Sequence, residues 1–426
     1  MRELREIQPI RGPIGATLTL PGSKSLTNRA LVIAALAEGE SELRGVQGGD
    51  DTRHMVSALD RLGFRIVWDR HAATIRIAGK GGDIPASGAE LFGGNAGTAV
   101  RFLTSLVGLG RGRFRIDGDP RMRERPIQDL LDGLAALGVA VRSEQANGCP
   151  PVIVDAAGIA GGAAAVAGDV SSQFASSILL VASYAARDVR LAIRGELVGA
   201  PFVDMTLGLM RRCGVESVRE GTEISVAAGQ RYRAGVMPIE PDATAASYFL
   251  AAAALLGGEV KVRGLDRGSL QGDVEFAAVL AAMGAHVRYD ADGLVVRGGA
   301  LRGVDHDFRA ISDTFLTAAA LAPFASSPTR IRGIGHTRRQ ESDRVSAVAR
   351  ELAALGARVH ESEDELRIEP SDLHGGEVET YGDHRIAMSF ALVGLRVAGV
   401  RIRDPRCVDK TFPDFFARLN SLRTGA

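Results

Sequence analysis

The chain has 426 residues, 46% of them hydrophobic and 5% aromatic, and its 51 basic residues are balanced by 51 acidic ones. This length is enough for two or three domains with their own cores, and the balanced charge without a basic block argues against nucleic acid as a partner. No apolar run reaches the roughly 20 residues of a membrane span, so we expect no membrane partner. Because MRELREIQPI lacks the apolar core of a signal peptide and Cys149, Cys213 and Cys407 lack metal-ligand spacing, we expect a reduced, cytoplasmic setting.

An Ala- and Leu-rich helix followed by a short β-branched strand recurs along the chain. Its helices are apolar nearly all round, as in LAAAALL of the fourth copy, and this is typical of helices in a domain interior. The copies span residues 27–46, 96–118, 171–195, 243–264, 312–333 and 383–404.

An amphipathic helix that closes on a glycine and a second strand follows each of these copies. In the first of them Met55, Leu59 and Leu62 make one apolar stripe, as expected for a helix with one buried face. The copies span residues 50–68, 125–143, 201–219, 272–289, 342–360 and, truncated, 412–423. The glycines placed to end these helices as C′ residues are Gly63, Gly138, Gly214, Gly284 and Gly356.

The repeating unit is therefore helix–strand–helix–strand, at a spacing of roughly 65–75 residues. Six units are too many for one core, and three plus three is the natural division. Pro- and Gly-rich seams at Pro21 and near residues 237–243 predict one lobe over 21–239 and a second over 1–20 plus 240–426. A plain doubly wound sheet is the alternative, although it gives no reason for six similar units.

Polar and basic residues gather at the starts of the apolar helices. Equivalent positions of repeats lie at equivalent ends of a domain, so we expect these helix starts to cluster, three in each lobe. N-capping alone explains the Ser, Asn and Asp residues, but not the added Lys and Arg, which oppose the helix dipole unless an anion lies between them. The residues are Ser23, Lys24, Ser25 and Arg29; Asn95, Gly97, Thr98 and Arg101; Ser171, Ser172 and Gln173; Asp242; Ser312 and Asp313; and Asp383, His384 and Arg385.

Two further segments and one lysine add charge. Segment 118–127 carries Arg121, Arg123 and Arg125, segment 336–344 carries Arg338, Arg339, Glu341 and Arg344, and Lys410 is a third candidate. Taken singly, each arginine is better explained by a solvated loop. Asp313 and Glu341 together offer a base and an acid beside an anion site, and the chain has no phosphate-binding Walker loop, dinucleotide fingerprint or His-Glu-x-x-His motif.

Seven stretches of the chain resemble the motifs of the 5-enolpyruvylshikimate-3-phosphate synthase family, in that family's order. The match extends over nearly the whole chain and is specific for the enolpyruvyltransferase superfamily. Lys24-Ser25 favours the shikimate branch, because the UDP-N-acetylglucosamine branch has Lys-Asn there. The stretches are PGSKSLTNRA, GGNAGTAVRFL, GDPRMRERPI, DVSSQF, RRQESDR, YGDHRIAMSFAL and DKTFPDFF.

The resemblance implies an α/β fold of two domains, an inside-out α/β barrel in which each domain holds three βαβαββ repeats and the active site lies in the cleft between them. It also implies that the 5-hydroxyl of shikimate 3-phosphate attacks C2 of phosphoenolpyruvate while C3 is protonated, after which the adduct loses phosphate. This reaction belongs to the shikimate pathway, which leads to chorismate and the aromatic amino acids. We expect no metal, no organic cofactor and a monomer.

The resemblance assigns roles residue by residue. The catalytic residues are Asp313 as proton acceptor, Glu341 as proton donor and Lys24. The residues expected to bind shikimate 3-phosphate are Lys24, Ser25, Arg29, Ser171, Ser172, Gln173, Asp313, His336 and Gln340. Those expected around phosphoenolpyruvate are Lys24, Asn95, Gly97, Thr98, Arg101, Arg125, Gln173, Arg344, His384, Arg385 and Lys410. Gly97 resembles the small residue that admits glyphosate, so sensitivity to this inhibitor is expected.

The chain departs from the family pattern mainly at positions that face shikimate 3-phosphate. Relatives often have Ser and Tyr where this chain has Gly199 and Phe202, and Asn and Lys where it has His336 and Gln340. Two alternatives therefore stay open: an enolpyruvyltransferase that uses another alcohol, and a catalytically silent homologue that binds an anion. Phe102 stands where many relatives have Pro, which concerns packing near Gly97.

Overall fold

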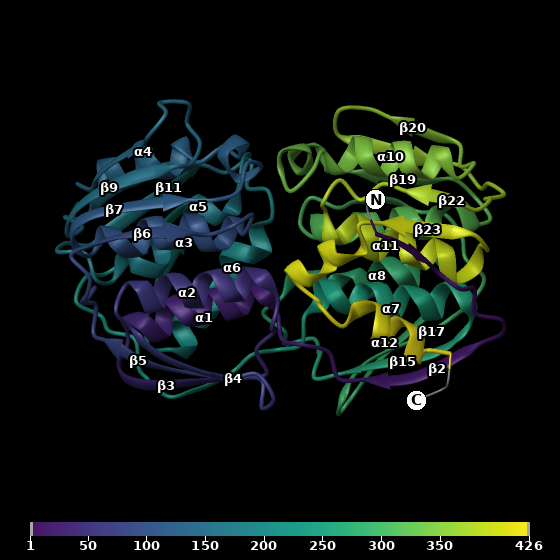
Figure 1. Cartoon of the computed structure of the whole chain (residues 1–426), viewed down its shortest axis with the longest axis horizontal. Helices are drawn as coiled ribbons and strands as arrows, with labels where there is room; N and C mark the ends of the chain where they lie inside the picture. The colour runs from purple at the N-terminus through teal and green to yellow at the C-terminus, as the bar shows by residue number, and fades with distance from the viewer. Residues whose placement is uncertain (1–2, 424–426) are drawn as a thin grey trace. The chain divides into compact units, whose positions relative to one another are not determined.

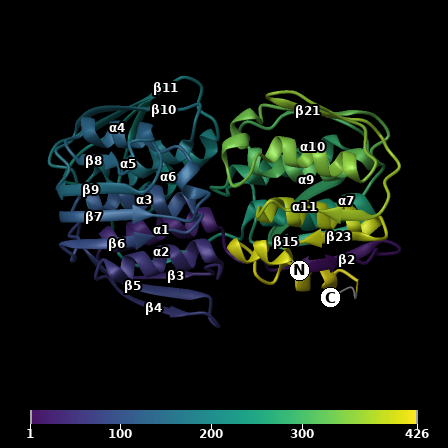
Figure 2. The ribbon, with the colours of Figure 1, turned by 45° about the horizontal axis from the view of Figure 1, so that its top comes forward.

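The computed structural model describes residues 3–423 of the chain, so the first two and last three residues of the predicted second lobe lie outside the described residues. The chain divides into two compact units. We term Gly22–Ile239 the N-terminal lobe, and the residues before Gly22 together with those from Glu240 onward the C-terminal lobe. Within each lobe the apolar helices lie inside and the sheets outside (Figures 1 and 2).

Three mixed sheets of the same order form the N-terminal lobe. In each, the first two strands are parallel and the others antiparallel. The sheets are β14 (Val236–Pro238), β3 (Glu38–Arg44), β5 (Thr74–Lys80), β4 (Arg65–Asp69); β6 (Gly88–Phe92), β7 (Arg111–Asp117), β9 (Val152–Ala157), β8 (Ala140–Ser143); and β10 (Gly162–Ala167), β11 (Val189–Arg194), β13 (Glu223–Val226), β12 (Val218–Glu220).

The C-terminal lobe repeats this arrangement, except that its third sheet is completed from the start of the chain. There β1 pairs antiparallel with β23 and takes the place of a hairpin. The sheets are β2 (Ile14–Leu18), β15 (Gly258–Arg263), β17 (Gly293–Arg297), β16 (His286–Asp290); β18 (Asp305–Asp307), β19 (Thr329–Arg332), β21 (Glu365–Ile368), β20 (Val359–Glu361); and β22 (Gly376–Val378), β23 (Val400–Arg403), β1 (Leu4–Glu6).

The helices alternate between the apolar and the amphipathic type, as the repeats predict. In the N-terminal lobe they are α1 (Lys24–Leu36), α2 (Asp50–Arg61), α3 (Gly97–Gly108), η1 (Met122–Glu124), α4 (Gln128–Ala136), α5 (Ser172–Ala182) and α6 (Ala200–Arg212). In the C-terminal lobe they are α7 (Ala243–Leu256), η2 (Gly272–Glu275), α8 (Phe276–Ala282), η3 (Ser312–Thr314), α9 (Phe315–Leu321), η4 (Ala322–Phe324), η5 (Gly335–Arg339), α10 (Arg344–Ala354), α11 (His384–Arg396), η6 (Pro405–Lys410) and α12 (Phe415–Ser421).

The glycines predicted to end the amphipathic helices do so. Gly63, Gly138, Gly214, Gly284 and Gly356 have φ angles of 89°, 90°, 94°, 103° and 101°. A residue with a Cβ pays a steric cost in this left-handed region, so glycine ends the helix and turns the chain into the next strand. The predicted stripe of Met55, Leu59 and Leu62 is fully buried.

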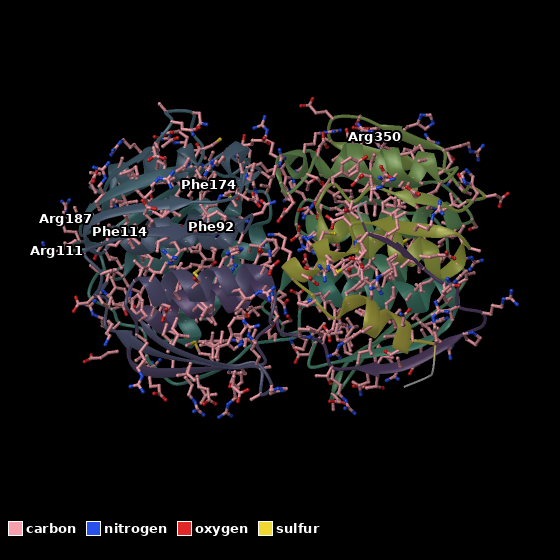
Figure 3. All side chains as sticks on the ribbon, in the orientation of Figure 1. Phe92, Arg111, Phe114, Phe174, Arg187 and Arg350 are labelled. Carbon is pink, nitrogen blue, oxygen red and sulfur yellow. The ribbon has the colours of Figure 1, made fainter. Side chains whose placement is uncertain are left out.

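Burial follows the two helix types. Nearly every residue of α7 is buried, and α9 and α11 join it in one hydrophobic core, as expected for helices that are apolar all round. Figure 3 shows the same contrast in the N-terminal lobe, where the buried Phe114 and Phe174 lie among the elements while Arg111 and Arg187 reach outward.

The repeat that begins at Ser312 has two local features of its own. Asp313 lies in the 3-10 turn η3 rather than at the N-cap of an α-helix, and α9 is short because Pro323 in the following turn cannot continue it. The predicted α/β fold of repeated units is confirmed. Within residues 3–423, every helix is too short or too polar to cross a membrane.

Candidate functional site

In the N-terminal lobe the starts of three apolar helices meet. The Asn28 amide on α1 donates to Thr98 Oγ1 on α3 at 2.7 Å, and the Arg101 guanidinium on α3 donates to Gln173 Oε1 on α5 at 3.0 Å. These links hold the three N-terminal ends at one side of the lobe. We term the residues there the N-terminal cluster: Lys24, Ser25, Arg29, Asn95, Gly97, Thr98, Arg101, Arg125, Ser171, Ser172 and Gln173.

Gly97 is the point on which the long side chains of this cluster converge. A Cβ atom on Gly97 would lie 2.6 Å from Arg101 Nη1, 2.9 Å from Arg125 Nη2 and 3.0 Å from Gln173 Oε1. Arg125 is held by the carbonyl and side-chain oxygens of Asn95 at 3.1 and 3.0 Å. The cluster therefore gathers two guanidinium groups and an amide around the start of α3.

Arg29 is a buried cation without a counterion. Its side chain is 1% exposed, and among the described residues no carboxylate pairs with it. Burial lowers the pKa of Arg29 to about 9. Its donors reach Thr206 Oγ1 at 2.7 Å, Ser25 O at 2.9 Å, Phe202 O at 3.0 Å and Ser176 Oγ at 3.2 Å. An uncompensated positive charge inside the lobe favours an anion near these helix ends.

Lys24 has a partner that the sequence did not reveal. Its Nζ lies 3.3 Å from Asp51 Oδ2, and Asp51 is buried in the first turn of α2. An acid at a helix start is normally explained by the helix dipole, so nothing in the sequence set Asp51 apart from its neighbour Asp50.

Of the three arginines in segment 118–127, Arg125 belongs to the N-terminal cluster. Arg121 pairs with Glu124 at 2.8 Å, and Arg123 pairs with Asp117 at 2.7 Å. Such partly exposed ion pairs contribute little to stability. Arg125 is the arginine of this segment that lies beside Gly97.

The departures at Gly199 and Phe202 are linked. Gly199 has φ 61° at the start of α6, and a Cβ there would lie 3.2 Å from both Ser172 Oγ and the Phe202 ring. A serine at this position would be strained by the backbone and crowded by Ser172. Phe202 meanwhile offers its carbonyl oxygen to Arg29.

In the C-terminal lobe, Arg344 at the start of α10 organises an acidic cluster. Its side chain is 1% exposed and donates to Asp383 Oδ2 and Asp313 Oδ1, both at 2.8 Å, to Glu341 Oε2 at 3.1 Å, and to Gln340 Oε1. We term the following residues the C-terminal cluster: Asp313, His336, Gln340, Glu341, Arg344, Asp383, His384, Arg385 and Lys410.

The two predicted proton-transfer residues thus share one guanidinium group. Burial alone would lower the pKa of Arg344, but Asp383, Glu341 and Asp313 raise it. Lys410 Nζ lies 3.8 Å from the other oxygen of Glu341. The arrangement keeps the two carboxyl groups side by side between Arg344 and Lys410.

Asp383 ties the start of α11 to this group. As the N-cap residue it accepts from the backbone N–H of Arg385 at 2.9 Å, and it also accepts from Ser342 Oγ at 3.0 Å. The Arg385 side chain then reaches Asp313 Oδ2 at 2.8 Å. The sequence identifies Asp383 only as a helix start, because a cap and a charged partner look alike in a sequence.

The two histidines of the cluster have lowered pKa values. Burial, and then the charge of Arg385, lower the pKa of His384 well below its ordinary value, and burial lowers the pKa of His336. His336 Nε2 lies 2.9 Å from Ser312 Oγ, beside Asp313. His384 is fully buried beneath the start of α11.

Arg338 and Arg339 do not join the cluster. Arg338 donates to Asp343 and Glu361 at 3.0 and 2.8 Å on the outer side of α10, and Arg339 is exposed. In the described part of the chain, no group of three His, Cys, Asp or Glu side chains has the arrangement of a metal site.

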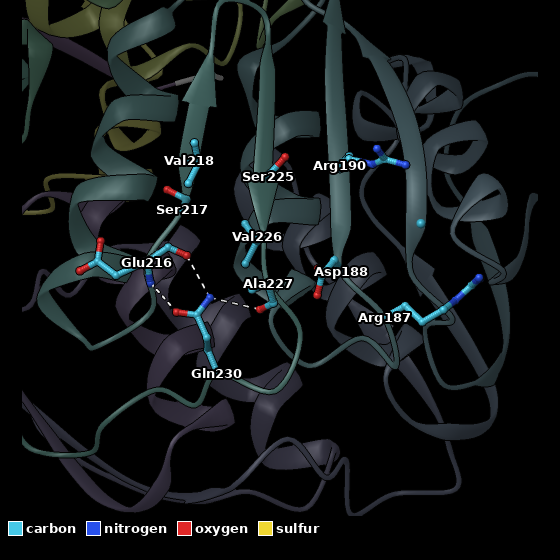
Figure 4. A pocket seen from close by; sticks show the side chains of 11 residues that line it. Arg187, Asp188, Arg190, Glu216, Ser217, Val218, Ser225, Val226, Ala227 and Gln230 are labelled. Carbon is cyan, nitrogen blue, oxygen red and sulfur yellow. Dashed lines mark hydrogen bonds between the residues drawn. The ribbon is translucent and has the colours of Figure 1, made fainter.

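A surface hollow of the N-terminal lobe lies apart from all these residues. It has a volume of about 770 Å³ and is lined by residues of the third sheet and its loops, including Arg187, Asp188, Glu216 and Gln230 (Figure 4). Gln230 already bonds the backbone of Glu216 in both directions, at 2.8 and 3.0 Å. The hollow is therefore not a candidate site, because its lining carries charges of both signs and the Gln230 amide group already has its hydrogen bonds.

Residues 9–419 match the family model described as EPSP synthase (3-phosphoshikimate 1-carboxyvinyltransferase). The curated 3-phosphoshikimate 1-carboxyvinyltransferase of Nostoc punctiforme is 46% identical over 97% of this chain and 98% of its own length. The protein of the same name from Shewanella loihica is 43% identical over 99% of this chain and 100% of its own length.

Solved structures show the same fold. The EPSP synthase of Acinetobacter baumannii superposes with a TM-score of 0.82 at 25% identity and covers 99% of this chain and 98% of its own. The enolpyruvyl transferase NikO from Streptomyces tendae superposes with a TM-score of 0.75 at 20% identity, covering 98% and 97% of the two chains. The latter similarity concerns the fold alone.

Proposed function

The chain belongs to the EPSP synthase (3-phosphoshikimate 1-carboxyvinyltransferase) family, and from that premise we propose that it transfers the enolpyruvyl group of phosphoenolpyruvate to the 5-hydroxyl of shikimate 3-phosphate, releasing phosphate. The observation that carries this proposal is the pair of carboxyl groups on Arg344: Asp313 at 2.8 Å and Glu341 at 3.1 Å. A base and an acid held by one guanidinium suit an addition in which one substrate loses a proton and the other gains one.

In the proposed reaction Asp313 takes the proton of the 5-hydroxyl as its oxygen attacks C2 of phosphoenolpyruvate. Glu341 gives a proton to C3, which turns the double bond into a methyl group in a tetrahedral adduct. Loss of phosphate and of one C3 proton then restores the double bond in the product. We assign Lys24, Arg385 and Lys410 the role of stabilising the anionic groups of this adduct.

The N-terminal cluster supports the binding of anions. Arg29 brings a buried positive charge that no carboxylate of the described chain offsets, and Ser171 caps α5, whose free N–H groups favour a phosphate. Because Arg29 is 1% exposed and donates four hydrogen bonds inside the lobe, we assign it chiefly the role of a fixed charge, with Ser172 and Gln173 as direct ligands of shikimate 3-phosphate.

The C-terminal cluster supports phosphoenolpyruvate binding only if Arg344 releases an acceptor. All five of its N–H donors are used, by three carboxylates and by Gln340. A neutral amide is a weaker acceptor for a cation than a carboxylate, so an incoming carboxylate would displace Gln340 first. The two clusters would then act on one pair of substrates, with no metal or organic cofactor.

Another alcohol acceptor remains the second candidate. It is favoured by Gly199, whose left-handed backbone and contact with Ser172 disfavour the serine common in relatives, and by Gln340, which replaces a lysine. The fully assembled Asp313, Glu341 and Arg344 group argues against a catalytically silent homologue. We also propose that the enzyme works in the cytoplasm. We propose that it is sensitive to glyphosate, because residue 97 is a glycine and Arg101 and Arg125 lie directly against it.

A phosphate-release assay tests the proposal. The purified chain is mixed with phosphoenolpyruvate and either shikimate 3-phosphate, unphosphorylated shikimate or no acceptor, with Glu341→Gln as the inactive control. Release only with shikimate 3-phosphate supports the main proposal. Release with a different alcohol and none with shikimate 3-phosphate would support the second candidate, and release with no acceptor at all would overturn both.

A further inference from the structure

The turn that leads into α11 carries a tyrosine in an unusual backbone conformation, and the proposed reaction does not use it. The backbone N–H of Asp383 donates to Thr380 O at 2.8 Å and closes the turn. Its two central residues, Tyr381 and Gly382, have φ angles of 55° and 67°. Positive φ at both central positions suits Gly, Asn or Asp, and a bulky residue there is strained. Such strain persists only where neighbouring contacts hold it, and it gathers at functional sites.

Helix α10 supplies the contact that holds this tyrosine. Glu351, in α10, is 6% exposed, and its Oε1 accepts a hydrogen bond from the Tyr381 hydroxyl at 2.6 Å. Its Oε2 accepts from the backbone N–H of Glu379, just before the turn, at 3.0 Å. Among residues 3–423 no basic group forms an ion pair with Glu351, and burying a carboxylate without a cation is costly. Both of its oxygens are thus bound to the segment that leads into α11.

The same helix holds the end of the turn at a second point. Arg344, the first residue of α10, donates to Asp383 Oδ2 at 2.8 Å. Residues seven apart lie on one face of a helix, so Arg344 and Glu351 hold the turn from the same side. Asp383 in turn accepts from the backbone N–H of Arg385, whose side chain reaches Asp313. The place of the Arg385 guanidinium therefore depends on where the turn is held.

We propose that Tyr381 and Glu351 are positioning residues that hold the turn 380–383 on α10 and thereby set where Arg385 presents its guanidinium to an anionic substrate. This inference rests on the proposed function, because that substrate is phosphoenolpyruvate. Without the Tyr381 hydroxyl the strained residue is free to relax, and the start of α11 moves with it. Both residues act through Arg385.

The first test is Tyr381→Phe, which removes only the hydroxyl. Its KM for phosphoenolpyruvate should rise about 5-fold or more, because a misplacement of about 1 Å in a group that holds the substrate can cost about 100-fold. The dissociation constant of shikimate 3-phosphate, measured by calorimetry, should change little, because Ser172 and Gln173, its assigned direct ligands, lie in the N-terminal lobe. An unchanged KM, or an equal loss for both substrates, would overturn the proposal.

Tyr184→Phe is the matched control. Tyr184 follows the end of α5, and its hydroxyl donates to Leu36 O at 2.7 Å and accepts from the backbone N–H of Tyr232 at 3.0 Å. The control therefore loses a hydroxyl of similar bonding, so its urea midpoint should fall while its KM for phosphoenolpyruvate stays that of the wild type. A similar rise of KM in the control would assign the effect to lost stability and overturn the proposal.

Two further variants separate the hydrogen bond from the backbone strain. Tyr381→Asn suits the left-handed backbone but is too short to reach Glu351, so it should raise the KM for phosphoenolpyruvate although it relieves the strain. Tyr381→Phe and Glu351→Gln disturb one contact, so their effects on KM should not multiply in the double variant. A wild-type KM in Tyr381→Asn, or a double variant with the product of the two single effects, would contradict the proposal.

Hydrogen exchange of the substrate-free protein gives a readout that separates this inference from the proposed function. The backbone N–H groups of Glu379, Asp383 and Arg385 all donate hydrogen bonds in or beside the turn. In Tyr381→Phe, peptides covering residues 379–386 should exchange about 5-fold faster or more, and in Tyr184→Phe they should exchange as in the wild type. Unchanged exchange in Tyr381→Phe would overturn the inference even in an active enzyme. Faster exchange in a chain without transferase activity would support the hold on the turn and overturn the proposed function instead.

Discussion

Substituting Gly97 by alanine is the sharpest test of the N-terminal cluster. The new Cβ would lie 2.6, 2.9 and 3.0 Å from Arg101 Nη1, Arg125 Nη2 and Gln173 Oε1, all closer than an ordinary contact. Both guanidinium tips must therefore move by several tenths of an ångström. Arg101 is also held by Pro126 O at 2.9 Å, which limits how it can yield.

The cost falls on substrate binding rather than on folding. Charge-assisted hydrogen bonds contribute about 1.5–3 kcal/mol each, and a loss of that size corresponds to roughly a 10- to 100-fold rise in the KM for phosphoenolpyruvate. Gly97 has no left-handed φ that would penalise alanine, so the urea midpoint should stay close to that of the wild type. The same crowding should weaken inhibition by glyphosate.

Steady-state kinetics with phosphoenolpyruvate as the varied substrate measure the effect, and Gly108→Ala is the matched control. Gly108 ends the same helix, and a Cβ there meets only apolar atoms of Val139 and Ile159 at 3.5 Å or more. This control should keep wild-type kinetics and gain up to about 1 kcal/mol of stability from helix propensity. An unchanged KM in a folded Gly97→Ala enzyme would refute the idea that the substrate lies among these three side chains.

Three further substitutions probe the rest of the site. Glu341→Gln keeps an acceptor for Arg344 but has no acidic proton, so kcat should fall about a hundredfold or more. The substrate affinity, measured by calorimetry, should change little. A near-normal kcat would show that Glu341 is not the proton donor. Gln340→Lys should lower the KM for shikimate 3-phosphate by up to about tenfold, because it adds a cation and releases one Arg344 donor; an equal or higher KM would mean that another cation fills this place. Thr206→Val leaves a buried arginine donor without its 2.7 Å acceptor and should cost about 1–3 kcal/mol in urea unfolding. Among the described residues the Thr104 hydroxyl bonds only Val100 O, so Thr104→Val should cost clearly less, and equal losses would contradict the reasoning.

The sequence by itself determined the repeat and the chemistry available. Alternating helix types, C′ glycines such as Gly63 and the buried stripe of Met55, Leu59 and Leu62 are local signals, because hydrophobic periodicity and backbone sterics act over a few residues. The motifs indicated the family, which the comparisons confirmed. The individual roles assigned to the site residues stay predictions.

Tertiary structure alone decided which charges pair. Arg29, Arg123 and Arg344 are all arginines in polar stretches. Arg29 is buried with no carboxylate of residues 3–423 beside it, Arg123 pairs on the surface, and Arg344 is bound by three carboxylates. Asp51 looks like an ordinary helix-start acid until folding brings Lys24 to it. Charge pairing depends on distance and burial, and both arise only when segments far apart in the chain pack together.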